Sequence, residues 1–85
     1  MKFNKKVLIL GASSDIGLSI MRIYNKKNYE IIAHYNKGNK NFFYFVKNNR
    51  NVKIIKFNFL TSTNKTEKFL KNNIFKNCSI FINAS

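Results

Sequence analysis

The chain has 85 residues, which allows one small domain at most. Hydrophobic residues make up 45% of it and aromatic residues 15%, too many for a disordered chain, and 3 Gly with no Pro argue against a loop-rich scaffold. The formal net charge is +13, but the lysines are spread over the whole length without a dense run. We therefore assign most of them to solvated helix faces and loops, and a nucleic-acid partner is the less favoured interpretation.

Cysteine, histidine and hydropathy narrow the class of protein further. Cys78 is the only cysteine, so no intramolecular disulfide can form and a reducing, cytoplasmic compartment is expected. His34 is the only histidine, which argues against a structural metal site. The apolar run at residues 7–10 is too short for a signal peptide, and no stretch approaches the ~20 apolar residues that span a bilayer. We expect neither a metal nor a membrane partner.

Strands and helices are predicted to alternate along the chain. Residues 7–10 are a continuous aliphatic run, typical of a strand covered on both faces. Apolar residues three and four positions apart predict the helices. The residues expected to face the sheet are Ile16, Ile20, Ile23 and Tyr24 in the first helix, Phe42, Phe43, Phe45 and Val46 in the second, and Phe69, Leu70 and Phe75 in the third. The expected elements are strand 7–10, turn 11–17, a helix to residues 27–28, strand 29–35, turn 36–39, a helix to about residue 49, strand 52–59, a helix capped by residues 61–63, and strand 78–82.

This alternation predicts an α/β fold. A β-α-β-α-β-α-β order with short right-handed crossovers gives a parallel sheet with helices on both faces. We expect a Rossmann-like sheet in the strand order 3-2-1-4, with residues 1–85 forming an incomplete domain that stops after the fourth strand. Ile80, Ile82 and parts of the first strand would then be exposed and prone to association, so we expect the isolated chain to be poorly stable or to aggregate.

The turn between the first strand and the first helix carries the functional motif. It runs Leu10-Gly11-Ala12-Ser13-Ser14-Asp15-Ile16-Gly17 and lies where an open α/β sheet binds a dinucleotide. Gly11 permits the tight turn, and Gly17 lets the helix approach the strand. Between them, Ser13, Ser14, Asp15 and Ile16 place backbone N–H groups and hydroxyls at the positive end of the helix, where a pyrophosphate is stabilised.

The motif resembles the glycine motif Gly-x-x-x-Gly-x-Gly of the short-chain dehydrogenase/reductases. Gly11 and Gly17 match its ends, and Asp15 stands in place of the middle glycine. Asn58-Phe59 is similar to the family's Asp-Val/Leu pair that contacts adenine. Asn83-Ala84 is similar to the Asn-Asn-Ala-Gly run after the fourth strand. The resemblance implies that this chain is the dinucleotide-binding segment of an oxidoreductase that transfers a hydride between cofactor and a carbonyl or hydroxyl group.

The end of the second predicted strand bears on the choice of cofactor. An acidic residue at this point would accept the ribose hydroxyls of NAD. The residues present are Tyr35, Asn36 and Lys37, which offer an amide and a cation instead. We therefore favour NADP, with NAD as the alternative.

The catalytic residues that the resemblance implies, a serine, a tyrosine and a lysine, are expected downstream of the fourth strand. No Tyr-x-x-x-Lys pair occurs in these 85 residues, so the catalytic set here is empty and the chain alone is predicted to be inactive. A substrate and a homo-oligomer are expected only for a longer form. Two other interpretations stay open: a small dinucleotide-binding module without catalysis, and a basic nucleic-acid-binding domain.

Overall fold

The computed structural model describes residues 5–58, 68 and 78–84, and these residues form an α/β fold around one four-stranded sheet. All three strand pairings are parallel, and the strand order is β3-β2-β1-β4, as predicted. The elements are β1 (Lys6–Leu10), α1 (Asp15–Lys26), β2 (Glu30–Tyr35), α2 (Lys40–Lys47), β3 (Val52–Lys56) and β4 (Ile80–Asn83).

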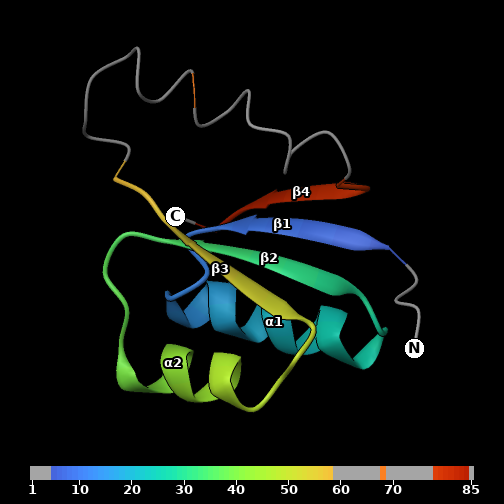
Figure 1. The fold of residues 1–85 in the computed structure, drawn as a ribbon, viewed down its shortest axis with the longest axis horizontal. Helices are drawn as coiled ribbons and strands as arrows, with labels where there is room; N and C mark the ends of the chain where they lie inside the picture. The colour runs from blue at the N-terminus through green and yellow to red at the C-terminus, as the bar shows by residue number, and fades with distance from the viewer. Residues whose placement is uncertain (1–4, 59–67, 69–77, 85) are drawn as a thin grey trace.

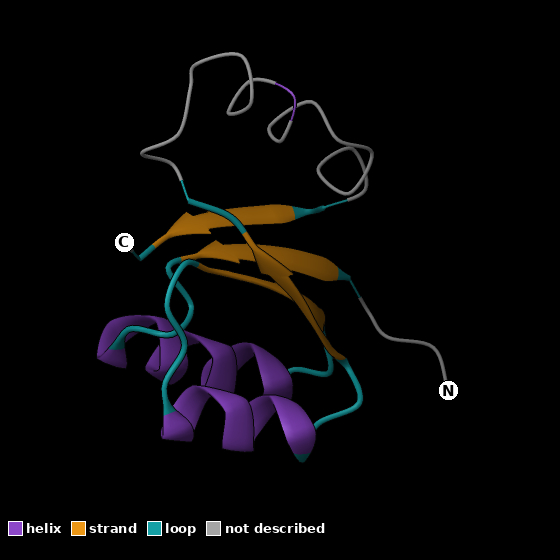
Figure 2. Cartoon of the chain, turned by 60° about the vertical axis from the view of Figure 1, so that its left-hand side comes forward, coloured by secondary structure: helices purple, strands orange, loops and turns teal. Residues whose placement is uncertain are grey.

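Both described helices lie on the same face of the sheet (Figures 1 and 2). The chain leaves β1 through α1 to β2, and then through α2 to β3, so each crossover moves one strand further from β1. β4 then pairs with the opposite side of β1, with Val7 aligned to Ile80 and Leu10 to Asn83. β1 is therefore, like β2, an inner strand with a neighbour on each side, which explains why its aliphatic residues are buried.

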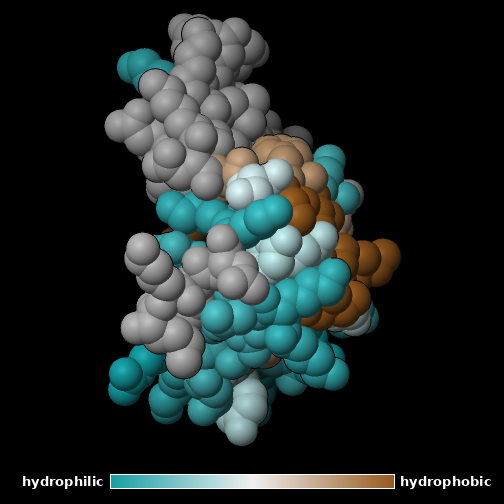
Figure 3. All heavy atoms as spheres, turned by 90° about the vertical axis from the view of Figure 1, so that its right-hand side faces the viewer, coloured by the Kyte–Doolittle hydropathy of each residue, from teal (hydrophilic) through white to brown (hydrophobic). Residues whose placement is uncertain are grey.

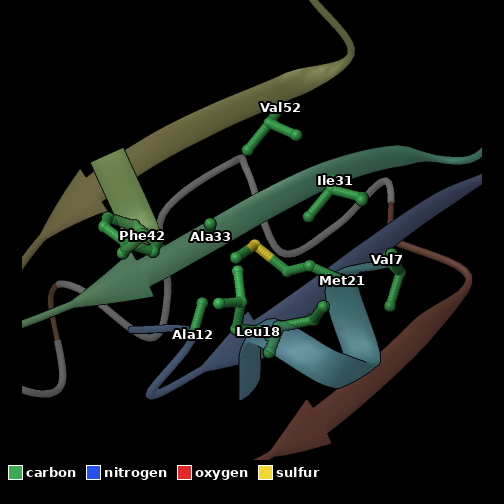
Figure 4. Close-up of a cluster of buried hydrophobic side chains, with 9 residues drawn as sticks. Val7, Ala12, Leu18, Met21, Ile31, Ala33, Phe42 and Val52 are labelled. Carbon is green, nitrogen blue, oxygen red and sulfur yellow. The ribbon is translucent and has the colours of Figure 1, made fainter. Parts of the chain in front are cut away.

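The main core lies between the sheet and the two helices. Figure 4 shows Leu18 and Met21 of α1 reaching toward Ile31 and Ala33 of β2. Phe42 of α2 is completely buried in the same cluster. A second, smaller cluster on the other face of the sheet consists of Leu8, Leu10 and Ile32. Strand alternation accounts for the two clusters, because successive side chains of one strand point to opposite faces.

The predicted buried face of α1 was right for two of its four residues and wrong for the other two. Ile16 is 67% exposed and Ile23 is 52% exposed, whereas Leu18 and Met21 are buried. Ile20 and Tyr24 are only half-buried at the margin of the core.

Leu18, Met21 and Asn25 lie on one side of α1, and this side faces the core. The Asn25 side-chain amide donates to Asn49 Oδ1 at 3.0 Å, and Asn51 donates to Asn25 Oδ1 at 2.7 Å. These bonds join the same side of the helix to the segment between α2 and β3. The isoleucines at positions 16 and 23, on the opposite side of the helical wheel, consequently face away from α2.

Truncating the two sides of α1 tests this assignment. Met21→Ala should lower the free energy of unfolding by about 2–5 kcal/mol, because it opens a cavity in the core. Ile23→Ala, on the same helix, should change it by no more than about 0.5 kcal/mol, because the side chain is half exposed. Urea denaturation followed by circular dichroism measures both. Equal losses of unfolding free energy in the two variants would instead support the apolar face predicted from the sequence.

Several smaller expectations also differ from the structure. β2 begins at Glu30 rather than at Tyr29, β3 ends at Lys56 rather than at residue 59, and β4 runs one residue past Ile82. α2 ends at Lys47, and Phe43, expected to be buried, is 44% exposed. The predicted third helix, with its cap at 61–63 and its apolar residues, lies outside the described residues.

The predicted apolar patch was wrong in its composition. β1 is buried, and Ile80 and Ile82 are half-buried because they pack against the main core. Of β4, Phe81 is the exposed large apolar residue, at 54%. The exposed isoleucines of α1 add to the apolar surface, and Figure 3 shows hydrophobic side chains gathered on one flank of the molecule.

The two outer strands of the described sheet differ in charge. β3 carries Lys53 and Lys56, both exposed, and Lys53 Nζ lies 3.0 Å from Glu30 Oε1. β4 consists of Ile80–Asn83 and carries no charged side chain.

Candidate functional site

The predicted site lies at the carboxyl ends of β1 and β4. From β1 the chain proceeds to β2 on one side, and it later reaches β4 on the other. In open parallel sheets such a reversal of strand order leaves a crevice beyond the carboxyl ends of the two strands at the reversal, and ligands bind there. The glycine turn begins at this point, directly after Leu10.

A left-handed residue starts the turn. Gly11 has φ of 72°, a conformation that costs a residue with a Cβ about 1–2 kcal/mol. The backbone N–H of Ser14 donates to Gly11 O at 3.1 Å, and the Ser14 hydroxyl donates to the same oxygen at 2.8 Å. The turn is therefore closed on its own carbonyl group.

Gly17 lies where α1 passes directly over the turn. A Cβ added to Gly17 would meet the carbonyl oxygen of Gly11 and would lie 2.7 Å from Ala12 Cα. These neighbours are backbone atoms in a closed turn, so they cannot move aside as a flexible side chain can. The sequence interpretation of Gly17 as the residue that permits close approach is consistent with this geometry.

Adding a methyl group at Gly17 should therefore destabilise the protein. Gly17→Ala is expected to lower the free energy of unfolding by about 1–3 kcal/mol through overpacking, although Ala normally favours a helix over Gly by about 1 kcal/mol. Gly38→Ala is the control, since its added Cβ would meet only the ring edge of half-exposed Phe43. Thermal unfolding compares the two variants. A neutral Gly17→Ala with a destabilised Gly38→Ala would contradict the assignment.

Ser14 joins the helix to the end of β4. It is the N-cap of α1, and its Oγ accepts the Gly17 N–H at 2.9 Å. The same hydroxyl lies 3.3 Å from Ala84 O, while the Ala84 N–H donates to Leu10 O at 2.8 Å. Ser14 thus connects the three segments that surround the carboxyl ends of β1 and β4.

The first turn of α1 presents donors toward this end of the sheet. Asp15 and Ile16 are the first two helical residues, and their N–H groups precede the first intrahelical hydrogen bond. Within the described part of the chain, neither N–H has an acceptor. The Asp15 side chain is exposed and carries the only negative charge in this turn.

Removing the cap should weaken α1. Ser14→Ala is expected to reduce the free energy of unfolding by about 1 kcal/mol, as for other serine N-caps. Ser19→Ala is the matched control, because the Ser19 hydroxyl bonds only to Asp15 O within its own helix, at the exposed surface. Its effect should stay within about 0.5 kcal/mol in the same chemical denaturation. Equal effects would show that Ser14 does not cap the helix.

The loop after β2 lies against the glycine turn. The Ser13 hydroxyl donates to Lys37 O at 2.8 Å, and the Asn39 amide donates to Ser13 O at 2.7 Å. Asn39 also caps α2, since its Oδ1 accepts the Phe42 N–H. The side chains of Asn36 and Lys37 are exposed beside this contact.

Tyr35 has a different environment from its two neighbours. Its ring centroid lies 5.0 Å from that of Phe42 and 5.5 Å from that of Phe43. The Tyr35 side chain therefore packs between the sheet and α2.

The remaining residues predicted to contact the cofactor lie at or just after the carboxyl ends of β4 and β3. Asn83 is exposed and ends β4, and Ala84 is half-buried beside Ser14. Asn58 is exposed and follows β3, two strands away from the glycine turn, and Phe59 lies outside the described residues. The structure thus brings the glycine turn, the loop after β2 and Ala84 into contact, while Asn58 lies beyond β2.

Sequence reasoning missed the role of His34. Its side chain is 3% exposed and lies between the glycine turn and the end of β3. The Gly11 N–H donates to His34 Nδ1 at 3.1 Å, and His34 Nε2 lies 2.8 Å from Phe57 O. A single histidine next to a predicted strand end gives no signal for such contacts, because the pattern of a strand says nothing about its neighbours across the sheet.

No family model matches the chain, and no curated protein matches it. Among the residues that the structure describes, no group of three or more His, Cys, Asp or Glu side chains could hold a metal ion. No helix within the same residues is long and apolar enough to cross a membrane.

Proposed function

We propose that this chain binds a nicotinamide dinucleotide at the carboxyl ends of β1 and β4. The observation that carries the proposal is the Gly11–Gly17 turn, in which a left-handed glycine, a capped helix and a close helix-to-strand approach occur together at the reversal of strand order. In a Rossmann-like site this is where the pyrophosphate lies, next to the N-terminus of the first helix.

The described residues are suited to the phosphates of such a ligand. Phosphate oxygens need hydrogen-bond donors, and the N–H groups of Asp15 and Ile16 at the start of α1 provide them. The absence of a Cβ at Gly17 lets α1 pack directly on the turn, which holds these donors at the carboxyl end of β1. The Asp15 carboxylate opposes an anion, whereas the net charge of +13 attracts one from solution.

The preference for NADP rests on the loop after β2. Lys37 is exposed in the loop whose backbone contacts Ser13. In a Rossmann-like site the adenosine ribose is expected beside the loop that follows the second strand. A 2′-phosphate gains a charge-assisted hydrogen bond from such a lysine, whereas a ribose hydroxyl gains much less.

The reaction class follows from the resemblance to short-chain dehydrogenase/reductases. In that class the dinucleotide supplies or accepts the hydride, and the protein binds and orients it. The residues of this chain would serve the binding step, as the cofactor-binding segment of a cytoplasmic oxidoreductase. The chain by itself should show no turnover.

Direct binding measurements test the proposal. Purified protein should bind NADPH more tightly than NADH in fluorescence titrations. Lys37→Ala should weaken NADPH binding roughly tenfold, equivalent to about 1.4 kcal/mol, and should leave NADH binding unchanged. Lys47→Ala is the matched control, because Lys47 is an exposed lysine at the C-terminal end of α2.

Three outcomes would count against the proposal. Absence of binding of either dinucleotide would refute the site. Equal affinity for NADPH and NADH would refute the NADP preference alone. Binding of DNA or RNA that depends steeply on salt, and that Gly17→Ala leaves unchanged, would favour the basic nucleic-acid-binding domain instead.

A further inference from the structure

His34 is a buried polar residue near the carboxyl end of β2, close to the glycine turn. It shares the sheet face of Ile32, where Leu8 and Leu10 are also buried, and it is aligned with Ile55 of β3. A polar ring in such surroundings needs partners for both nitrogens. It has them in the Gly11 N–H and the Phe57 carbonyl group.

These two partners define the protonation state of the ring. The Gly11 N–H donates to Nδ1, so Nδ1 must carry a lone pair. Nε2 lies 2.8 Å from a carbonyl oxygen, so Nε2 must carry the hydrogen. The ring is therefore the neutral Nε2–H tautomer. A second proton would be placed on Nδ1 and would face the Gly11 N–H, leaving two donors opposed.

The backbone of His34 holds the same turn. The Ala12 N–H donates to His34 O at 2.8 Å, and the next residue, Tyr35, accepts the Phe57 N–H through its carbonyl oxygen at 3.0 Å. The ends of β1, β2 and β3 are thus joined at one point. Displacement of the ring would act directly on the left-handed residue that starts the turn.

We propose that His34 is a positioning residue for the glycine turn: its neutral ring holds Gly11 in place for the dinucleotide, and its protonation releases the turn and weakens binding. The dinucleotide part of this inference rests on the function proposed above. The link between His34 and Gly11 does not, since it exists without a ligand.

The surroundings of His34 favour the neutral ring. Burial lowers the pKa of His34 below its ordinary value of 6.5, and the hydrogen bond to Phe57 opposes that shift in part. The charged side chains described on the same sheet face are Lys6, Glu30 and Lys53, all near the amino ends of their strands. Glu30 is four residues from His34 on β2, roughly 13 Å at the usual strand rise. Lys56 is aligned with Tyr35 and belongs to the opposite face.

The sign of the pH dependence follows from this shift. Because the unfolded chain takes up the proton at a higher pH than the folded chain, stability from the neutral ring is fully present above pH 6.5. It is lost as the pH falls through the lowered pKa of the folded state. His34 is the only histidine, so it dominates side-chain titration between about pH 5 and 7.

The first experiment needs no ligand. NMR titration of the full 85-residue protein should give a pKa of His34 below 6.5, and the Gly11 amide resonance should shift with the same midpoint. Melting temperature should fall over that pH range. A pKa at or above 6.5, or a Gly11 resonance that does not follow the ring, would overturn the link.

The second experiment separates the two hydrogen bonds. His34→Asn places an acceptor near the position of Nδ1, and His34→Gln places a donor near that of Nε2. The probe is NADH, because the 2′-phosphate of NADPH itself titrates near pH 6. Wild type should bind NADH more weakly at about pH 5.5 than at about pH 7.5, by less than about tenfold because the pKa of His34 in the folded protein lies below 6.5. His34→Asn should keep the affinity and lose this pH dependence, while His34→Gln should bind weakly at both pH values.

The outcomes of the two experiments are distinguishable. If wild type binds no dinucleotide at neutral pH while the Gly11 resonance follows His34, the proposed function fails and the link stands. If NADH binds but His34→Asn keeps the pH dependence, or His34→Gln binds as well as wild type, His34 does not position the turn. Lys47→Ala should titrate and bind like wild type in every measurement.

Discussion

The contact between Gly17 and the backbone of Gly11 and Ala12 is the constraint on which the other features of this edge depend. It sets how closely α1 approaches β1, because a single methyl group would not fit between them. With the helix at this distance, the Ser14 hydroxyl reaches both the turn and Ala84 beyond β4. The helix N-terminus therefore faces the carboxyl ends of two strands that are far apart in sequence but paired in the sheet.

Three neighbouring segments hold the turn from different directions. Ser14 connects the turn to the end of β4, and Ser13 connects it to the loop after β2. His34 of β2 accepts a hydrogen bond from the Gly11 N–H. Each contact uses one polar side chain and one backbone group, so the turn keeps its shape without a bound ligand. Preformed donors of this kind are typical of phosphate-binding turns, since little ordering is then required on binding. This pre-organisation is the strongest physical support for the proposed dinucleotide site.

The strand order and the place of the turn could be predicted from the sequence, but the rotation of α1 and the role of His34 could not. Continuous aliphatic strands alternating with amphipathic segments restrict the chain to a parallel sheet with few topologies. The buried face of α1 instead carries Leu18 and Met21, and beside them Asn25, whose partners Asn49 and Asn51 are remote in sequence and meet it only in the folded chain. Ile16 and Ile23 have helical spacing, yet spacing alone cannot tell a core stripe from an apolar surface. The partners of His34 likewise belong to the residues directly after β1 and β3, the strands on either side of it.

The two outer strands of the described sheet differ in charge, and they therefore differ in how readily a further strand could pair with them. A strand adding beside β3 would have to strip water from Lys53 and Lys56, which is the usual protection of a sheet edge against unwanted pairing. A strand adding beside β4 would meet only isoleucine, phenylalanine and asparagine side chains. Among the described residues, charged side chains therefore discourage the addition of a strand beside β3, whereas the side chains of β4, whose carboxyl end forms one wall of the crevice, carry no such charge.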